Sequence, residues 1–141
     1  MREIKFRAWD GKGMIGSGDT WGVGNPEYAI GFDGKVLRKA DNYGRGSDYA
    51  EYMSEDGHEN YTLMQYTGLK DKNSVEIYEG DIVRRYTGQD CEGNNEVLKV
   101  VWHNRDARWK MTANDFNHHD NWCFSKEIIG NIYENPDLLK E

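Results

Sequence analysis

The chain has 141 residues, and its 18 basic and 25 acidic side chains give a formal net charge of −7 at pH 7. Aromatic residues make up 13% of the sequence, which is too many for a disordered chain, and no apolar run is long enough for a membrane-spanning helix. The length fits one domain, and the acidic balance argues against a general binder of nucleic-acid backbones.

Residues 3–9 alternate between two sets of side chains, which predicts a half-buried strand. Its two faces carry Ile4, Phe6 and Ala8 on one side and Lys5, Arg7 and Trp9 on the other. Residues 10–13 (DGKG) favour a turn that ends this strand.

Residues 11–60 are rich in glycine and show no sustained periodicity, so we expect an irregular region. Within it, residues 29–37 predict two short strands about an Asp-Gly turn. Residues 47–60 carry five acidic side chains and no Lys or Arg. This acidic segment predicts a solvated loop, with a site for a cation or a basic partner as the alternative, and the sequence leaves the order of residues 40–60 open.

The second half of the chain predicts a series of short strands. They cover residues 61–67, 75–78, 82–86, 96–103, 109–113 and 128–133, and the turns between them fall at residues 68–74, 79–81, 88–95 and 104–106. Residues 96–103 have apolar side chains on both faces, which is typical of a central strand. Asn135 and Pro136 favour a short helical turn, with Asn135 as its N-cap.

Short strands joined by Gly, Asn and Asp turns predict a mainly β fold, either a small barrel or a sandwich. Gly80 and Asp81 stand where small SH3-like barrels enter their first long strand, so we expect an SH3-like barrel part in the C-terminal half. We therefore predict a single domain over residues 1–141, with an irregular β extension in residues 1–60 and the barrel in residues 61–141.

Three blocks of the sequence stand out together. They are residues 2–9 (REIKFRAW), residues 65–73 (QYTGLKDKN) running into residues 76–83 (EIYEGDIV), and residues 129–136 (IGNIYENP). In this order they resemble the YopX family of phage and prophage proteins. The resemblance implies a phage or prophage origin, a mainly β fold with an SH3-like barrel part, and self-association. It implies no known activity and supplies no catalytic residue. The central turn of the family usually reads Asn-Gly, whereas this chain has Asn73-Ser74, so we expect Asn73 to adopt the left-handed conformation.

Residues 115–123 (DFNHHDNWC) form the one metal-like cluster of the sequence. Asp115, His119 and Cys123 share a helical spacing of four, while His118 and Asp120 would share a strand face. The flanking residues predict no firm helix, and no CxxC or HExxH motif is present, so we interpret the segment as a polar loop and keep a zinc site at His118 and His119 as the alternative.

The sequence shows no convincing catalytic set. Cys91 lies between Asp90 and Glu92, whose charges disfavour a thiolate, and we expect Cys91 and Cys123 to be inert free thiols. Carboxylate pairs such as Glu79 and Asp81 lack any sign of a cleft that would hold them across a substrate. We predict no enzyme activity, no catalytic residue, no cofactor and no bound metal.

Basic and aromatic residues occur together in two places, and these are our candidate binding faces. They are Lys5, Arg7 and Trp9 on the first strand, and Arg84, Arg85 and Tyr86 together with Arg108 and Trp109. Small β barrels bind single-stranded nucleic acid by stacking bases on aromatic rings beside a basic groove. The interpretation that we favour places Trp9 and Trp109 in the core, with the charges at its rim.

Together these features favour a non-enzymatic accessory protein of a phage or prophage that binds a protein partner or itself. Single-stranded nucleic-acid binding is the alternative, and mimicry of phosphates by the acidic residues 48–59 is a weaker variant of protein binding. The chain begins with charged residues rather than an apolar signal segment, so we expect it in the cytosol of the host bacterium, away from membranes.

Overall fold

The computed structural model describes residues 3–15, 28–30, 36–39, 52–53, 61–86, 95–113, 118–119 and 125–140, with only the backbone of residues 28–30, 36–39, 52–53 and 118–119. The chain divides into two compact units. The first unit is Lys5–Met64, and the second unit comprises Met1–Ile4 and Gln65–Glu141. The single domain expected over residues 1–141 stays a prediction.

The first unit begins with a short hairpin, in which the strand predicted over residues 3–9 is present but limited to residues 6–9. Strand β1 (Phe6–Trp9) pairs antiparallel with β2 (Met14–Ile15). In the turn between them, Asp10 Oδ1 accepts the backbone N–H groups of Lys12 and Gly13, each at 2.7 Å. Gly11 has φ +92°, a conformation that glycine adopts without steric cost.

The glycine-rich region contains the two short strands expected between residues 29 and 37. Strand β3 (Tyr28–Ile30) pairs antiparallel with β4 (Val36–Lys39), which pairs in turn with β5 (Tyr52–Met53). Apart from the backbone of β5, the acidic segment at residues 47–60 lies outside the described residues.

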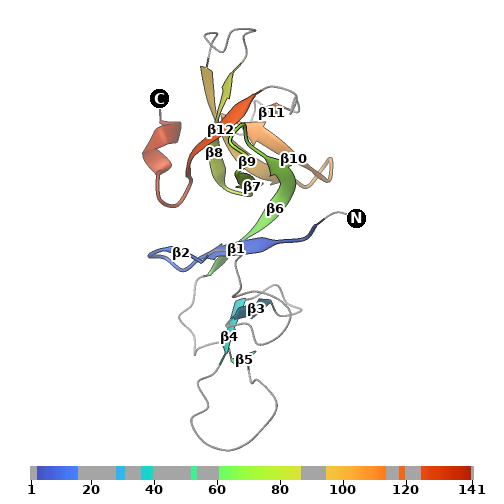
Figure 1. Ribbon diagram of the computed structural model, residues 1–141, viewed down its shortest axis with the longest axis vertical. Coiled ribbons are helices and arrows are strands. Elements are labelled where there is room, and N and C mark those ends of the chain that lie inside the picture. The colour runs from blue at the N-terminus through green and yellow to red at the C-terminus, as the bar shows by residue number, and fades with distance from the viewer. Residues whose placement is uncertain are drawn as a thin grey trace, which may run out of the picture. The chain divides into compact units, whose positions relative to one another are not determined.

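The second unit is built around a five-stranded antiparallel sheet (Figure 1). Its order is β11 (His118–His119), β10 (Arg108–Thr112), β9 (Asn95–His103), β8 (Asp81–Tyr86) and β12 (Lys126–Asn131). The central position of β9 confirms the prediction made from its two apolar faces, and the mainly β fold is confirmed as well.

One face of this sheet carries the main core of the unit, and we call it the core face. The core cluster consists of Ile77, Val83, Leu98, Val100, Trp109 and Met111, with Ile128 packed against it. Ile77 comes from β7 (Glu76–Tyr78), which pairs with β6 (Thr62–Lys70), so the hairpin formed by β6 and β7 contributes to the same core.

The turn predicted at residues 79–81 joins β7 to β8, and its backbone is also bonded to β9 and to the segment that follows β12. Gly80, with φ +79°, donates its N–H to the Val100 carbonyl and accepts the Ile132 N–H, both at 2.9 Å. Asp81 is 1% exposed, and its carboxylate accepts the Tyr78 N–H at 2.8 Å. Asp81 is therefore a structural residue that fixes the entry to β8.

The structure corrects the predicted end of β6. We expected a strand to residue 67 and a turn at residues 68–74, but β6 continues to Lys70 and the turn occupies residues 71–75. The register of β6 and β7 shifts between Tyr66 and Lys70, where Gly68 has φ +87°. Gly68 therefore belongs to an irregularity within the strand and not to a tight turn.

The structure also corrects the residue that holds the left-handed conformation in this turn, because Ser74, not Asn73, has φ +66°. Asp71 sets this geometry. Its Oδ1 accepts the N–H groups of Asn73 and Val75 at 2.8 and 2.9 Å, and its carbonyl accepts the Ser74 N–H at 3.0 Å. Asn73 thus lies inside the turn, and the chain turns back at Ser74.

The predicted C-terminal helical turn is present as a 3-10 helix, η1 (Pro136–Leu139). We expected the Asn135 side chain to cap this helix, but it makes no capping hydrogen bond. The Asn135 side-chain oxygen instead accepts the Asn131 N–H at 3.3 Å, and Asn131 Oδ1 accepts the N–H groups of Tyr133 and Glu134. These bonds end β12 at Asn131, two residues before the predicted end.

Candidate functional site

The predicted binding residues are divided between the two units. Lys5, Arg7 and Trp9 belong to the first unit, where Arg7 donates to the sulfur of Met64 at 3.8 Å. The other five belong to the second unit, whose sheet allows each of them to be assigned to a face. They are Arg84, Arg85, Tyr86, Arg108 and Trp109.

Neighbouring residues of β8 lie on opposite faces of the sheet, so the structure separates Arg84 from Arg85. Val83 belongs to the core cluster, and Arg85 shares its face. The Arg85 side chain is 7% exposed and forms an ion pair with Glu96, its cross-strand neighbour on β9. Arg84 and Tyr86 lie on the second face of the sheet.

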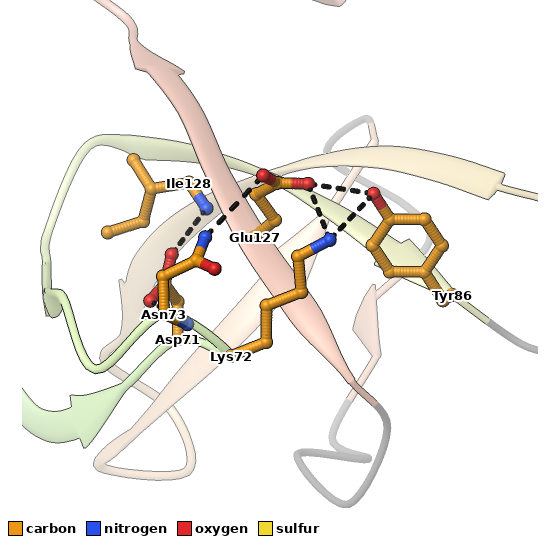
Figure 2. Close-up of polar contacts among 6 residues, drawn as sticks. All are labelled: Asp71, Lys72, Asn73, Tyr86, Glu127 and Ile128. Atoms are coloured by element: carbon orange, nitrogen blue, oxygen red, sulfur yellow. Dashed lines mark hydrogen bonds and ion pairs between the residues drawn. The ribbon is translucent and has the colours of Figure 1, made fainter. Parts of the chain in front are cut away.

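Tyr86 is engaged by the turn between β6 and β7 (Figure 2). Its hydroxyl donates to Glu127 on β12 at 2.8 Å, and the Lys72 ammonium lies 4.6 Å from the centre of its ring. Lys72 also pairs with Glu127 at 2.9 Å. The Tyr86 ring therefore already has a cation over it, which leaves less of it for stacking against a ligand.

The same contacts shift two pKa values. Hydrogen bonds from Lys72 and then from Tyr86 hold the pKa of the Glu127 carboxyl below its ordinary value. Glu127 in turn raises the pKa of the Lys72 amine. Lys72 is accordingly a protonated cation at neutral pH and is not poised as a nucleophile.

Trp109 and Trp102 face each other across β9 and β10, but only one of them reaches the surface. Trp109 is 9% exposed and belongs to the core cluster, as the favoured interpretation of the sequence predicts. Its cross-strand partner Trp102 is 39% exposed. The two rings meet edge to face with their centroids 5.0 Å apart, a favourable aromatic geometry that holds Trp102 in place.

Trp102 lies at the end of a hairpin that also carries several charged side chains. We call this segment, residues 102–110, the hairpin tip. It contains the end of β9, the turn at residues 104–107 and the start of β10, in which His103 pairs with Arg108. Ala107 in this turn has φ +50°, and Arg105 is exposed.

Asp106 organises the cations of the hairpin tip. Its carboxylate lies 2.5 Å from the Lys110 ammonium, 3.3 Å from His103 Nδ1 and 3.5 Å from the Arg108 guanidinium. The hydrogen bond from Lys110 is the main cause that lowers the pKa of Asp106. The Lys110 side chain is 8% exposed, whereas that of Arg108 is 52% exposed, so Arg108 is the one that a partner can reach.

The hairpin tip is the candidate functional site of the described residues. Its exposed tryptophan is Trp102, whereas the sequence analysis named Trp109. The alternation of residues 96–103 places Trp102 on the same face as Leu98 and Val100, which belong to the core cluster, but alternation does not determine how exposed a side chain is. The position of Trp102 next to the predicted turn at residues 104–106 was the available signal that the core could end before it.

Most of the remaining sequence candidates lie outside the described residues, so these interpretations stay predictions. The backbone of His118 and His119 forms β11, while Asp115, Asp120, Cys91 and Cys123 lie outside the described residues. Within the described part of the chain, no group of three or more His, Cys, Asp or Glu residues could hold a metal ion. None of the described helical segments is long and apolar enough to cross a bilayer.

Comparisons with known proteins give a consistent picture. A family model described as YopX protein matches residues 5–140. The structure is similar to the crystal structure of protein EF1440 from Enterococcus faecalis, with 27% sequence identity, 99% of each chain covered and a TM-score of 0.60. It also shares its fold with protein yopX from Bacillus subtilis, with 23% identity, 98% of each chain covered and a TM-score of 0.59. No curated protein matches the sequence.

Proposed function

The chain belongs to the YopX protein family, and from this premise we propose that it is a non-enzymatic accessory protein of a phage or prophage. It acts by binding a protein partner or a second copy of itself in the cytosol of the host bacterium. The second unit is its SH3-like barrel part, an assignment that the consecutive antiparallel strands β8, β9 and β10 support.

The observation that carries this proposal is the exposed Trp102 at the hairpin tip. A tryptophan that is 39% exposed leaves a large apolar surface in water. Tryptophan and arginine are enriched among the residues that contribute most to protein–protein affinity. The same hairpin tip carries the exposed Arg105 and Arg108.

The hairpin tip is also ordered before any partner arrives. The edge contact with Trp109 limits the motion of the Trp102 ring, and Asp106 ties the turn to β10 through Lys110. Side chains that are fixed in advance lose less conformational entropy on association. This preorganisation supports a role in binding.

The test is a capture experiment from host lysate with the immobilised chain and its Trp102→Ala variant. We expect Trp102→Ala to lose the captured protein, and sedimentation velocity on the same variants to report any loss of self-association.

Val75→Ala is the matched control, because Val75 is a 51% exposed apolar residue of the second unit on a different hairpin. Trp102→Phe keeps a ring against Trp109 and shows whether any loss comes from misfolding. Equal capture and equal size for Trp102→Ala and the wild type would contradict the proposal.

Single-stranded nucleic-acid binding remains the second candidate. The observation in its favour is that Arg84, Tyr86 and Arg108 lie on the same face of the sheet, as their register positions on β8, β9 and β10 indicate. It predicts quenching of tryptophan fluorescence by an oligonucleotide and an affinity that falls steeply with salt. The absence of quenching at low salt would remove this candidate.

A further inference from the structure

This inference rests on the proposed function and names the chemistry of the partner. We infer that the hairpin tip docks on an acidic protein surface, in which an apolar pocket for Trp102 is bordered by carboxylates that pair with Arg105 and Arg108.

The charge of the hairpin tip is the first argument. Three cations, Arg105, Arg108 and Lys110, stand against the single carboxylate of Asp106, so the tip is positive in a chain of net charge −7.

The distribution of these charges makes the arginines the groups that meet a partner. Asp106 lies closest to Lys110, whose side chain is buried, so that much of its negative charge is compensated within the protein. Arg105 is exposed, and Arg108 keeps 52% of its side chain exposed. The planar guanidinium group matches a carboxylate with two parallel hydrogen bonds.

The faces of the hairpin favour an enclosing protein surface over an extended nucleic-acid strand. Trp102 lies on the core face beside Trp109, whereas the next pair, His103 and Arg108, points to the opposite face. A nucleic-acid strand needs rings and cations along one groove. Here the indole and the Arg108 guanidinium lie on opposite faces of one hairpin end, which suits a pocket that surrounds the tip.

The experiment uses labelled polymers as defined probes of the full chain at low salt, because screening weakens contacts between exposed charges. The probes are a glutamate–tyrosine copolymer, which offers carboxylates and rings, and an oligothymidylate. We expect the wild type to bind the copolymer, and the double variant Arg105→Gln/Arg108→Gln to weaken this binding by about tenfold, the loss of roughly one strong charged contact. Lys140→Gln is the matched control, since Lys140 is an exposed cation of the same unit whose ammonium pairs with the exposed Asp137.

Three results would overturn the inference. They are no binding of the copolymer, equal affinity for the double variant and Lys140→Gln, and tighter binding of oligothymidylate than of the copolymer. Arg105→Gln alone leaves the contacts of Asp106 in place, so a loss of affinity in this variant cannot come from a distorted turn. The capture experiment with Trp102→Ala does not depend on these arginines, so failure here with Trp102-dependent capture would reject the acidic partner and leave the binding function standing.

Discussion

Ser74 adopts a backbone conformation that costs energy for any residue with a side chain. Its φ of +66° lies in the left-handed region, which is disfavoured by roughly 1–2 kcal/mol for most residues other than glycine. The family pattern usually has glycine after the asparagine of this turn, and the structure gives the reason, because the position after Asn73 is the one that turns back.

We predict that Ser74→Gly stabilises the protein. Relief of the left-handed strain exceeds the greater entropy loss of glycine, so the net gain is about 0.5 kcal/mol. Urea unfolding followed by fluorescence measures it as a higher midpoint with an unchanged slope. Ser74→Ala keeps the strain and serves as the control. A lower midpoint for Ser74→Gly than for Ser74→Ala would contradict the prediction.

Gly130 on β12 is constrained by close approach. A Cβ atom at this position would lie 2.5 Å from the side-chain oxygen of Asn135 and 2.9 Å from its Cγ atom. That oxygen accepts the Asn131 N–H, so the Asn135 side chain cannot move away without losing the bond. The sequence IGNIYENP therefore packs its glycine against its second asparagine.

We predict that Gly130→Ala destabilises the protein by about 1–3 kcal/mol, the usual range for overpacking. The double variant Gly130→Ala/Asn135→Ala removes the group that the new methyl would meet. We therefore expect it to be less destabilised than the sum of the two single variants. Strict additivity in thermal or urea unfolding would argue against this contact.

At the scale of elements, the turn between β6 and β7 is bound to β12 (Figure 2). Asp71 Oδ2 accepts the Ile128 N–H at 3.1 Å, and the Lys72 N–H donates to the Lys126 carbonyl at 2.9 Å. Asn73 adds a side-chain contact with Glu127 at 3.5 Å. One carboxylate thus shapes its own turn and attaches that turn to a strand 57 residues away.

We predict that Asp71→Ala costs about 3 kcal/mol, because Asp71 is buried and its loss leaves three backbone N–H groups without their acceptor. Hydrogen exchange should accelerate at Asn73, Val75 and Ile128 in particular. Lys72→Met is the control, since its partly exposed ion pair with Glu127 contributes much less than the Asp71 bonds. Comparable losses for Lys72→Met and Asp71→Ala would refute the role given to Asp71.

At the scale of the whole molecule, carboxyl groups with shifted pKa values determine how stability changes in acid. Backbone N–H groups of Gly13 and Lys12 lower the pKa of Asp10, as Lys110 lowers that of Asp106 and Lys72 that of Glu127. Burial raises the pKa of Glu79 above its ordinary 4.5. The first three groups favour the folded state when ionised, and Glu79 favours it when protonated.

We predict two opposite effects of pH on unfolding. The three lowered groups contribute stability that is complete above their ordinary values of 3.8 and 4.5 and is lost as the pH falls through their folded values. The raised group loses stability as the pH rises from 4.5 through its folded value. Glu79→Gln should therefore be more stable than the wild type at pH 7, and this advantage should disappear near pH 4. An advantage that is the same at both pH values would contradict the assignment.

Local sequence patterns were sufficient to predict an element where a residue type or its spacing favours a single local structure. Alternation along residues 96–103 and 82–86 predicted β9 and β8 and their faces, because a strand repeats every two residues. Asp10 and Gly80 marked turns whose hydrogen bonds the structure then displays. Ser74 was missed because Asn and Asp in one turn leave several hydrogen-bond patterns open, and the choice depends on which N–H groups Asp71 reaches.

By itself, the sequence determined the mainly β class, most strand positions and the separation of side chains between the two faces of the sheet, since these follow from neighbours along the chain. The tertiary structure decided which of the paired tryptophans is covered, what the Asp71 carboxylate binds across 57 residues and which ring Lys72 covers. The face of the sheet on which a side chain lies follows from its position along the strand. How exposed a side chain is at the end of a strand depends on how far the layer packed against that face extends. A carboxylate in the sequence likewise does not specify its partner, because every nearby backbone N–H competes for it until the chain is folded.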